Sequence, residues 1–421
     1  MKNTLVSSNS KLKMSSISLW ALSGLLFFGC ATYQTKVDSA RTDLSSRNPE
    51  KAMKTLQPLA EEEGKDQLVY VLDYAVALQQ AGNYKESARL LGKAEKIADI
   101  QDYTSLSREA SSLILNAEMV QYKGDDFEKI LINAVNAINY LMMNQLDDAL
   151  VEVRRVNEKL YKFKFDAKRD YEQSPYASYL AGLIWEADGK YDDSYIDYKK
   201  AHELAPNFTP LHADLIRAAI RARRDEDVAK WKAAYPEVQV GADWKDSKNG
   251  ELVFIFQQGW GPRKYARPGA PRFPKLFPVI TSTRRAELDI EGVDKVLTES
   301  IYSVQDVEIK TLENAYAGIV AKRIAGVATK AILADQIRQK NKLLGDLTSF
   351  ALNASDRADL RQWSTLPETF QIARKFLKAG TYKISAQGLN VSGSPSNENM
   401  PAQEIRVLPG RKTFITWRSF R

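Results

Sequence analysis

The chain has 421 residues and a formal net charge of +7, with 44% hydrophobic and 27% charged residues. This length suggests two or three domains, and the composition excludes a mostly disordered chain and a multi-span membrane protein. Two histidines and one cysteine leave almost no material for a zinc site, a disulfide framework or a histidine-dependent nucleophile. We therefore expect no enzyme activity, no metal and no cofactor.

The N-terminus has the anatomy of a secretory signal. Three lysines precede an apolar run over residues 17–28, which is too short to span a bilayer comfortably. The only cysteine, Cys30, follows this run after a glycine, and this order resembles the lipobox of bacterial lipoproteins. The resemblance implies a signal peptide over residues 1–29, acylation of Cys30 and, because Ala31 comes next, sorting to the outer membrane of a Gram-negative cell. The alternative is an uncleaved signal anchor in which the cysteine is buried and inert.

Charge is distributed unevenly along the rest of the chain. Residues 31–240 carry a net charge of −6, and residues 241–421 carry +10. Such an asymmetry indicates two domains with different partners, or two faces that attract each other. Nucleic acid is not an expected partner outside the cytoplasm.

Residues 30–238 are predicted to form a helical repeat domain. Small and aromatic residues recur there at a spacing that looks like the tetratricopeptide repeat, most clearly around Gly189 and again around Gly82 and Asn144. The glycine at 189 suits the left-handed end of a first helix, and small residues at the pair contact let two antiparallel helices touch. Three copies are enough for a stable stack.

Further half-repeats are expected around residues 50–60 and 220–235. The three turns are 62 and 45 residues apart, so insertions should carry extra helix, notably around residues 122–133.

First-helix residues of such repeats are expected to line a concave groove that takes an extended peptide or a helix. The candidate residues for this groove are Gln79, Gln80, Tyr176, Tyr179 and Glu186. Packing between repeats is the alternative role for the aromatic residues. The doubled cation Arg154–Arg155 is either a solvated face or an anchor for an acidic motif of a partner protein.

Residues 239–421 are predicted to form a basic, β-rich domain. Glu251–Gly259 has the composition of a buried strand. Residues 259–278 contain five prolines, so we expect an extended loop. The candidate residues in this loop for an anionic ligand are Arg263, Lys264, Arg267, Arg272 and Lys275. The alternative is a loop laid over a sheet, with its cations solvated.

A long helix is expected over about residues 308–342. Its predicted role is to cover the sheet, with binding to a membrane surface as the second interpretation. The remaining segment has turn signals at 379–380 and 409–410 between short alternating runs, which is typical of an antiparallel sheet or a small sandwich. The predicted fold class is therefore α + β in two domains, an all-α repeat solenoid followed by a β-rich domain.

The motifs as a set resemble a known family. In order they are LDYAVALQQAGNYKESARLL, LVEVRRVNEKL, ASYLAGLIWEADGKYDDSYIDYKKA, ELVFIFQQG and RQWSTLPETFQIAR. With the lipobox, they are similar to a family of bacterial tetratricopeptide-repeat outer-membrane lipoproteins of unknown function. Some relatives are encoded near lipoproteins of the penicillin-binding-protein activator kind, which implies a role in the cell envelope.

These observations lead to one main functional hypothesis. The chain would be a lipid-anchored, periplasm-facing scaffold that recruits a protein partner through its repeat groove, in assembly or maintenance of the cell envelope. The alternative is that the basic domain binds an envelope glycan such as peptidoglycan, or an anionic lipid.

Overall fold

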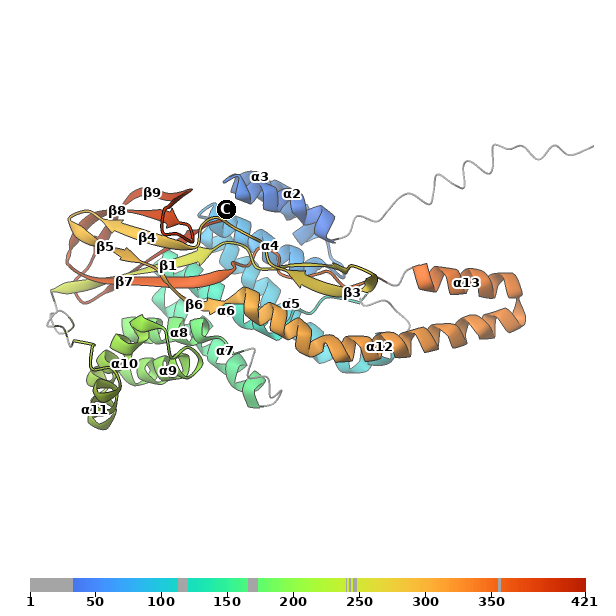
Figure 1. The fold of residues 1–421 in the computed structure, drawn as a ribbon, viewed down its shortest axis with the longest axis horizontal. Helices are drawn as coiled ribbons and strands as arrows, with labels where there is room; N and C mark the ends of the chain where they lie inside the picture. The colour runs from blue at the N-terminus through green and yellow to red at the C-terminus, as the bar shows by residue number, and fades with distance from the viewer. Residues whose placement is uncertain are drawn as a thin grey trace, which may run out of the picture.

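The computed structural model describes residues 33–112, 120–165, 173–239, 241, 244, 248–354 and 357–421. Figure 1 shows the arrangement of helices and strands. The predicted signal peptide and Cys30 lie outside the described residues, so they stay predictions.

The N-terminal half consists of antiparallel helix pairs. In the described residues these are α2 (Tyr33–Ser45) with α3 (Pro49–Glu61), α4 (Gln67–Gln80) with α5 (Tyr84–Ser112), α6 (Asp126–Met142) with α7 (Leu146–Phe165), α8 (Pro175–Ala187) with α9 (Tyr191–Leu204), and α10 (Thr209–Arg221) with α11 (Asp225–Ala234). Each pair turns at a residue with positive φ, namely Arg47, Gly82, Asn144, Gly189 and Arg223. The three predicted repeats and both half-repeats are confirmed.

Small residues let the helices of a pair approach each other, as the spacing predicts. A Cβ atom on Gly182 would lie 2.5 Å from the ring of Tyr198, so only glycine fits there. Ser194 donates a hydrogen bond of 2.9 Å to the Gly182 carbonyl, and Ser87 donates the corresponding bond of 2.8 Å to the Ala75 carbonyl. The same contact thus recurs in two repeats.

The extra length between the first two predicted turns is not where we expected it. It lies in α5, which extends to 29 residues. The segment around residues 122–133 instead contains the start of α6, where Asp125 and Glu128 form a capping box. The segment that we expected to be an insertion is therefore the beginning of the next repeat.

The C-terminal half is built mainly of strands. They are β1 (Asn249–Gln258), β2 (Arg263–Arg267), β3 (Ala270–Phe277), β4 (Arg285–Ile290), β5 (Val293–Leu297), β6 (Glu299–Ser303), β7 (Thr369–Lys378), β8 (Gly380–Leu389), β9 (Pro395–Val407) and β10 (Lys412–Arg418). One sheet has the order β10-β1-β7-β6, a second has the order β5-β4-β8-β9, and β2 pairs with β3. Strand β10 runs parallel to β1, and the other pairs are antiparallel. Of the two predicted alternatives, an antiparallel sheet or a small sandwich, the structure has two sheets that share a core, and both predicted turns are confirmed.

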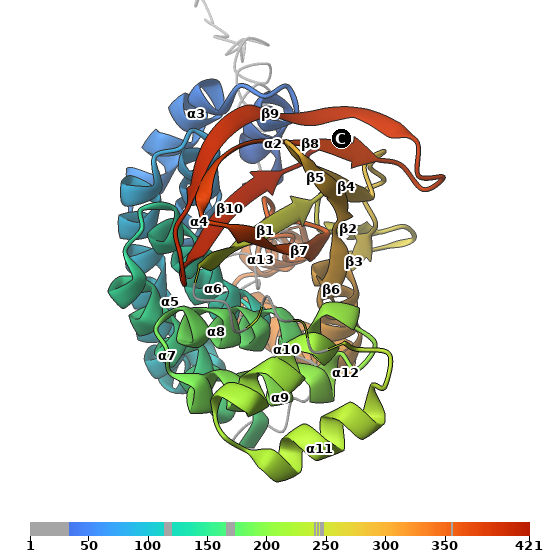
Figure 2. The same ribbon diagram turned by 90° about the vertical axis from the view of Figure 1, so that its left-hand side faces the viewer.

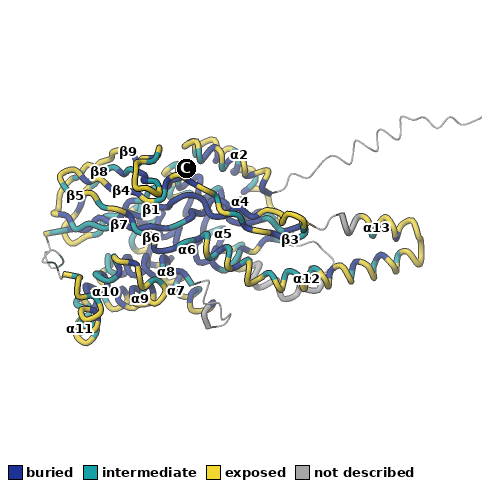
Figure 3. The backbone as a smooth tube through the Cα atoms, in the orientation of Figure 1, coloured by how far each residue is buried: buried dark blue, intermediate teal, exposed yellow. Residues whose placement is uncertain are grey.

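Strand β1 shows how the layers stack. Its Val253 and Ile255 side chains join the hydrophobic core of the helices, while Leu252, Phe254 and Phe256 join a second core shared with the other sheet. Successive side chains of a strand point to opposite faces, so this strand is buried on both sides. In Figure 2 the helices curve around the strands, and in Figure 3 the enclosed sheet and helix faces are buried.

The expectation of an extended loop in the basic half is wrong. The proline-rich stretch is not a loop but the β2–β3 ribbon, whose two strands meet at Gly269 with a φ of 76°. A two-stranded ribbon tolerates proline because each strand has a free edge. Strand β9 likewise has a proline, Pro395, at its first residue.

The long helix does not cover the sheet. Helix α12 (Val304–Lys340) touches β3 and β7 and then projects from the body, with α13 (Lys342–Ala354) folded back along it (Figure 1). Across the part of the chain that the structure describes, none of the helices combines the length and apolar character needed to cross a membrane.

Candidate functional site

The concave face of the repeats is covered by the C-terminal half of the same chain. Tyr176 stacks on Phe370 of β7, with ring centroids 4.1 Å apart. Gln79 donates to Asn139 and accepts a hydrogen bond of 3.3 Å from Gln257 of β1. These first-helix side chains do line the concave face, as the repeat pattern predicts, but they contact strands rather than solvent.

A segment over residues 359–368, with a turn at Ser364 and Thr365, fills the part of the face formed by α2, α4 and α6. Asp73 on α4, which is fully buried, accepts hydrogen bonds from the Thr365 backbone N–H at 3.1 Å and from the Thr365 and Ser364 hydroxyls at 2.9 and 3.0 Å. Tyr33 on α2 donates to the same carboxylate and to the Gln362 carbonyl, both at 2.7 Å. Burial raises the pKa of Asp73, although these hydrogen bonds oppose the shift.

Glu128 on α6, the first helix of the next repeat, binds the same segment. Its carboxylate accepts the Trp363 backbone N–H and the Tyr122 hydroxyl, both at 2.7 Å. Burial raises the pKa of Glu128 to about 7, with a further contribution from the charge of Asp125. The repeats therefore bind backbone N–H groups of this segment through two buried carboxylates, and the segment belongs to the same chain.

Arg361 ties the beginning of this segment to the helices. Its guanidinium donates to the backbone carbonyls of Lys65 and Val120 at 3.1 and 2.7 Å. It also pairs with Asp66 at 3.2 Å and with Asp359 at 2.7 Å. The beginning and the middle of the segment thus have polar partners on the repeats.

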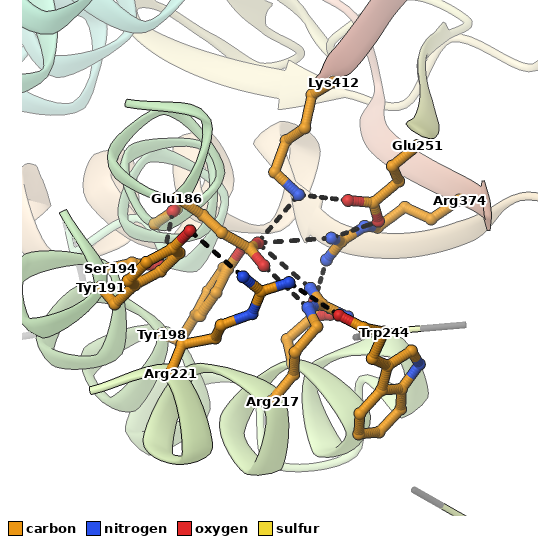
Figure 4. Close-up of polar contacts among 12 residues, drawn as sticks. Glu186, Tyr191, Ser194, Tyr198, Arg217, Arg221, Trp244, Glu251, Arg374 and Lys412 are labelled. Carbon is orange, nitrogen blue, oxygen red and sulfur yellow. Dashed lines mark hydrogen bonds and ion pairs between the residues drawn. The ribbon is translucent and has the colours of Figure 1, made fainter. Parts of the chain in front are cut away.

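The other half of the concave face carries a buried cluster of charges, which we call the charge lock (Figure 4). Its carboxylates are Glu186, Asp214 and Glu251, and its cations are Arg217, Arg374 and Lys412. The repeats provide Glu186, Asp214 and Arg217, while the first sheet provides the other three. All six side chains are at most 8% exposed. The lock is electrically balanced and joins the two halves of the chain.

In the charge lock, the ion pairs affect the pKa of Glu186 more than burial does. Arg217 lies 2.7 Å from both Glu186 and Asp214, and Lys412 lies 2.9 Å from Glu186. Burial alone would raise the pKa of Glu186, but the charges of Arg217 and Lys412 hold it well below its ordinary value. Tyr179 donates to Asp214 at 2.5 Å and accepts from Arg374 at 3.0 Å. Two candidate groove residues, Tyr179 and Glu186, therefore belong to this internal junction.

The remaining candidate groove residues, Gln80, Arg154 and Arg155, do not lie together. Gln80 is half-buried at the end of α4. The Arg154 guanidinium lies 5.5 Å from the ring centroid of Trp185. Arg155 points elsewhere and pairs with Glu95 at 2.9 Å and Glu152 at 3.1 Å. The doubled cation is thus not one binding site.

Arg155 lies in a cleft between α5, α6 and α7, with a volume of about 1040 Å³, which we call the outer cleft. Its lining includes four acidic and seven basic side chains, the latter being Arg89, Lys93, Lys96, Lys129, Arg155, Lys159 and Lys162. Lys159 lies at the centre of a buried network, 2.8 Å from Glu95 and 2.6 Å from the Asn133 amide oxygen. Lys96 and Lys162 are exposed at the cleft. The outer cleft therefore presents an excess of positive charge to solvent.

The candidate anionic-ligand residues all lie on the β2–β3 ribbon, but they differ in how far they are exposed to solvent. Arg263 and Lys264 are buried, where Arg263 pairs with Asp38 and Lys264 donates to the Arg361 carbonyl at 3.0 Å. These two cations hold the fold together, so the prediction that they form a solvent-facing ligand surface is wrong. Arg267 hydrogen-bonds to the Tyr316 hydroxyl at 2.5 Å, and Arg272 is half-buried.

Lys275 is exposed beside the ring of Phe277. Within the described ranges, no group of three or more histidine, cysteine, aspartate or glutamate side chains is placed to hold a metal ion.

Sequence analysis missed the partners of the repeats. The sequence of residues 361–374 resembles the family pattern but does not indicate a role for its polar residues. Buried Asp73 and Glu128 carried a signal, because a carboxylate on an otherwise apolar helix face needs a hydrogen-bonding partner. The identity of that partner depends on contacts between residues 235 to 292 positions apart.

Comparisons with known proteins match the helical half. No protein-family model matches the chain, and no curated sequence shows significant similarity. Among solved structures, MamA from Desulfovibrio magneticus RS-1 is 18% identical, with a TM-score of 0.31, covering 48% of this chain and 90% of MamA. A kinesin light chain with TPR-like repeats from Podospora anserina is 14% identical (TM-score 0.33, 49% and 97% covered).

The Rap conjugation regulator of plasmid pLS20, solved with the Phr* peptide, is 16% identical (TM-score 0.30, 56% and 60% covered). These likenesses are partial, and the fold assignment rests on the helix pairs themselves.

Proposed function

We propose that the chain is a lipid-anchored, periplasm-facing scaffold, without enzymatic activity, that recruits an acidic segment of a cell-envelope protein into the outer cleft. The anchor is Cys30, as the lipobox resemblance predicts. The observation that carries the proposal is the combination of a filled concave face with an open, cation-rich cleft on the other side of α6. Tetratricopeptide-like pairs commonly act as binding platforms, and this cleft is formed entirely by such pairs.

The chemistry of the cleft favours an acidic partner. Exposed Lys96 and Lys162 can approach carboxylates without breaking an existing contact of the fold, and Arg155 is partly exposed between them and the buried network. Long-range attraction of this kind accelerates encounter and adds specificity. The concave face is a less favourable binding site for a partner protein, because the partner would first have to displace residues 359–368 from Asp73 and Glu128.

Site-specific photo-crosslinking in cells tests the proposal. A photoreactive residue at position 96 or 162 should yield one crosslinked protein, while the same residue at position 199, on the exposed side of α9, should not. The double charge reversal Lys96→Glu/Lys162→Glu should weaken the crosslink made from position 155 at least about tenfold. The matched control Lys199→Glu/Lys232→Glu should leave it unchanged. Equal crosslinking from all positions would remove support for the cleft.

The anchor has its own test. The variant Cys30→Ser should accumulate as an unacylated precursor and disappear from the outer-membrane fraction. Normal outer-membrane fractionation of this variant would contradict the anchor while leaving the cleft untouched.

The alternative function, binding of an envelope glycan through the basic ribbon, has narrower support. Arg267 and Lys275 are its exposed cations, whereas Arg263 and Lys264 are buried. Co-sedimentation with peptidoglycan sacculi that is abolished by Arg267→Glu/Lys275→Glu would favour this alternative.

A further inference from the structure

The α12–α13 hairpin carries an unusual amount of exposed apolar surface. Of the sixteen large hydrophobic side chains exposed among the described residues, seven lie on these two helices. They are Ile324, Val327, Ile332, Leu343, Leu344, Leu347 and Phe350. Apolar surface gathered in this way marks an interaction site, whereas single exposed apolar residues are normal.

Helix α13 packs on α12 with its apolar stripe turned away. Gly345 faces α12 so closely that a Cβ atom there would lie 2.4 Å from the Cα of Arg338. Leu343, Leu347 and Phe350 are spaced i, i+4 and i+7, which places them together on the opposite side of the helix. They are 69%, 55% and 74% exposed. An amphipathic helix normally packs with its apolar side against the rest of the protein. The exposed stripe of α13 therefore indicates a binding partner outside the monomer.

The charge of the hairpin indicates what that partner is. The whole hairpin, residues 304–354, has seven basic and five acidic side chains, a net charge of +2, and its residues 314–354 have six basic and two acidic side chains, a net charge of +4. Both acidic side chains, Asp335 and Asp346, lie near Arg338, at 3.9 and 2.9 Å. Lys340 and Lys342 are exposed on either side of the turn at Asn341. This excess of positive charge opposes pairing with a second identical hairpin and favours an anionic surface.

The position of the hairpin fits the same partner. The 32 residues before the first described residue, Tyr33, contain the predicted acylated Cys30, three positions upstream. In Figure 1, α2 begins on the side of the molecule from which α12 and α13 project. A membrane reached by the lipid anchor would therefore be within reach of the hairpin.

We propose that α13, held out by α12, binds the surface of a bilayer that contains anionic phospholipid. Leu343, Leu347 and Phe350 enter the boundary between headgroups and acyl chains, and Lys340 and Lys342 contact headgroup phosphates. This is the interfacial mode of an amphipathic helix, with basic residues beside a buried apolar face. The inference rests in part on the proposed anchor, because the anchor brings the hairpin to the membrane.

The test uses residues 31–421, which include every described residue and contain no cysteine. A polarity-sensitive fluorophore attached to Phe350→Cys should shift to shorter wavelength with vesicles of phosphatidylethanolamine and phosphatidylglycerol, and brominated lipids should quench it. The same fluorophore on Ile280→Cys, an exposed residue outside the hairpin, should not respond. Phosphatidylcholine vesicles should bind more weakly, and added salt should weaken binding to the anionic vesicles.

A triple variant supplies the second measurement. Leu343→Gln/Leu347→Gln/Phe350→Gln should weaken partitioning onto anionic vesicles about 100-fold, while Ile280→Gln/Val391→Gln/Leu408→Gln should not. Circular dichroism should show both variants folded, since all six side chains are exposed.

An unresponsive fluorophore would overturn the proposal. So would a response without lipid that follows a monomer–dimer equilibrium in light scattering, because the stripe would then bind a second copy. Since this chain lacks Cys30 and keeps the outer cleft, neither result depends on the anchor or on the protein partner.

Discussion

Replacing Arg374 by methionine should destabilise the protein strongly. Arg374 lies among the three carboxylates of the charge lock and is nearly buried, with side-chain exposure of 7%. Its loss leaves three buried carboxylates opposite two cations, Arg217 and Lys412. Removing one partner of a buried ion pair costs about 3–5 kcal/mol because an uncompensated charge remains. We expect a loss in this range for the free energy of unfolding, measured by urea denaturation at pH 7.5.

The deficit should depend on pH in a defined direction. In the unmodified protein, the Arg374 and Lys412 charges overcome burial and hold the pKa of Glu251 below its ordinary value. Its contribution to stability is therefore complete above the unfolded-state pKa and is lost as pH falls through the lower folded-state pKa. Without Arg374 the buried carboxylates bind protons more readily, so lowering pH from 8 to 5 should relieve part of the deficit of Arg374→Met.

Two further variants make the test specific. Arg285→Met removes an exposed arginine of β4 and should change stability by no more than about 0.5 kcal/mol. Glu251→Gln combined with Arg374→Met restores the charge balance, so the double variant should be less destabilised than the sum of the two single changes. Additive losses, or a deficit that does not vary between pH 5 and 8, would refute the role of the lock.

Other predictions concern the packing of the repeats and the segment on their concave face. Gly182→Ala should cost about 1–3 kcal/mol in urea denaturation because its Cβ would meet the Tyr198 ring, whereas Gly92→Ala, in an open interior position of α5, should be neutral or stabilise by up to about 1 kcal/mol. Equal effects would contradict the packing. Asp73→Ala should cost at least about 3 kcal/mol, since it leaves the Ser364 hydroxyl and both the backbone N–H and the hydroxyl of Thr365 without their acceptor, and Asp73→Asn should cost less. A harmless Asp73→Ala would show that the segment is not held there.

The repeats could be predicted from the sequence because their contacts are local. Gly182, Ser194 and Tyr198 lie within 16 positions of one another, so their spacing alone implies two touching helices. Strand β1 was equally readable, since a short apolar run that is buried on both faces needs no alternation. In both cases the residues that determine the structure lie close together along the chain.

The coverage of the concave face could not be predicted in the same way. Whether Tyr176 faces a partner or Phe370 of the same chain depends on how two distant segments pack. The same holds for Arg263, whose charge looks solvent-facing in the sequence but meets Asp38, 225 positions away. The projection of α12 was missed because an apolar face on a helix predicts burial without saying against what.

Closure of the concave face by residues 359–368 is the central feature of this fold. Hydrogen exchange at single-residue resolution measures this, because the backbone N–H groups of Trp363 and Thr365 donate to the buried carboxylates of Glu128 and Asp73. We predict that both amides exchange only when the whole protein unfolds, as slowly as amides of β1. Exchange as fast as that of an exposed turn such as residues 391–394 would show that the segment leaves the groove readily, and would contradict the account.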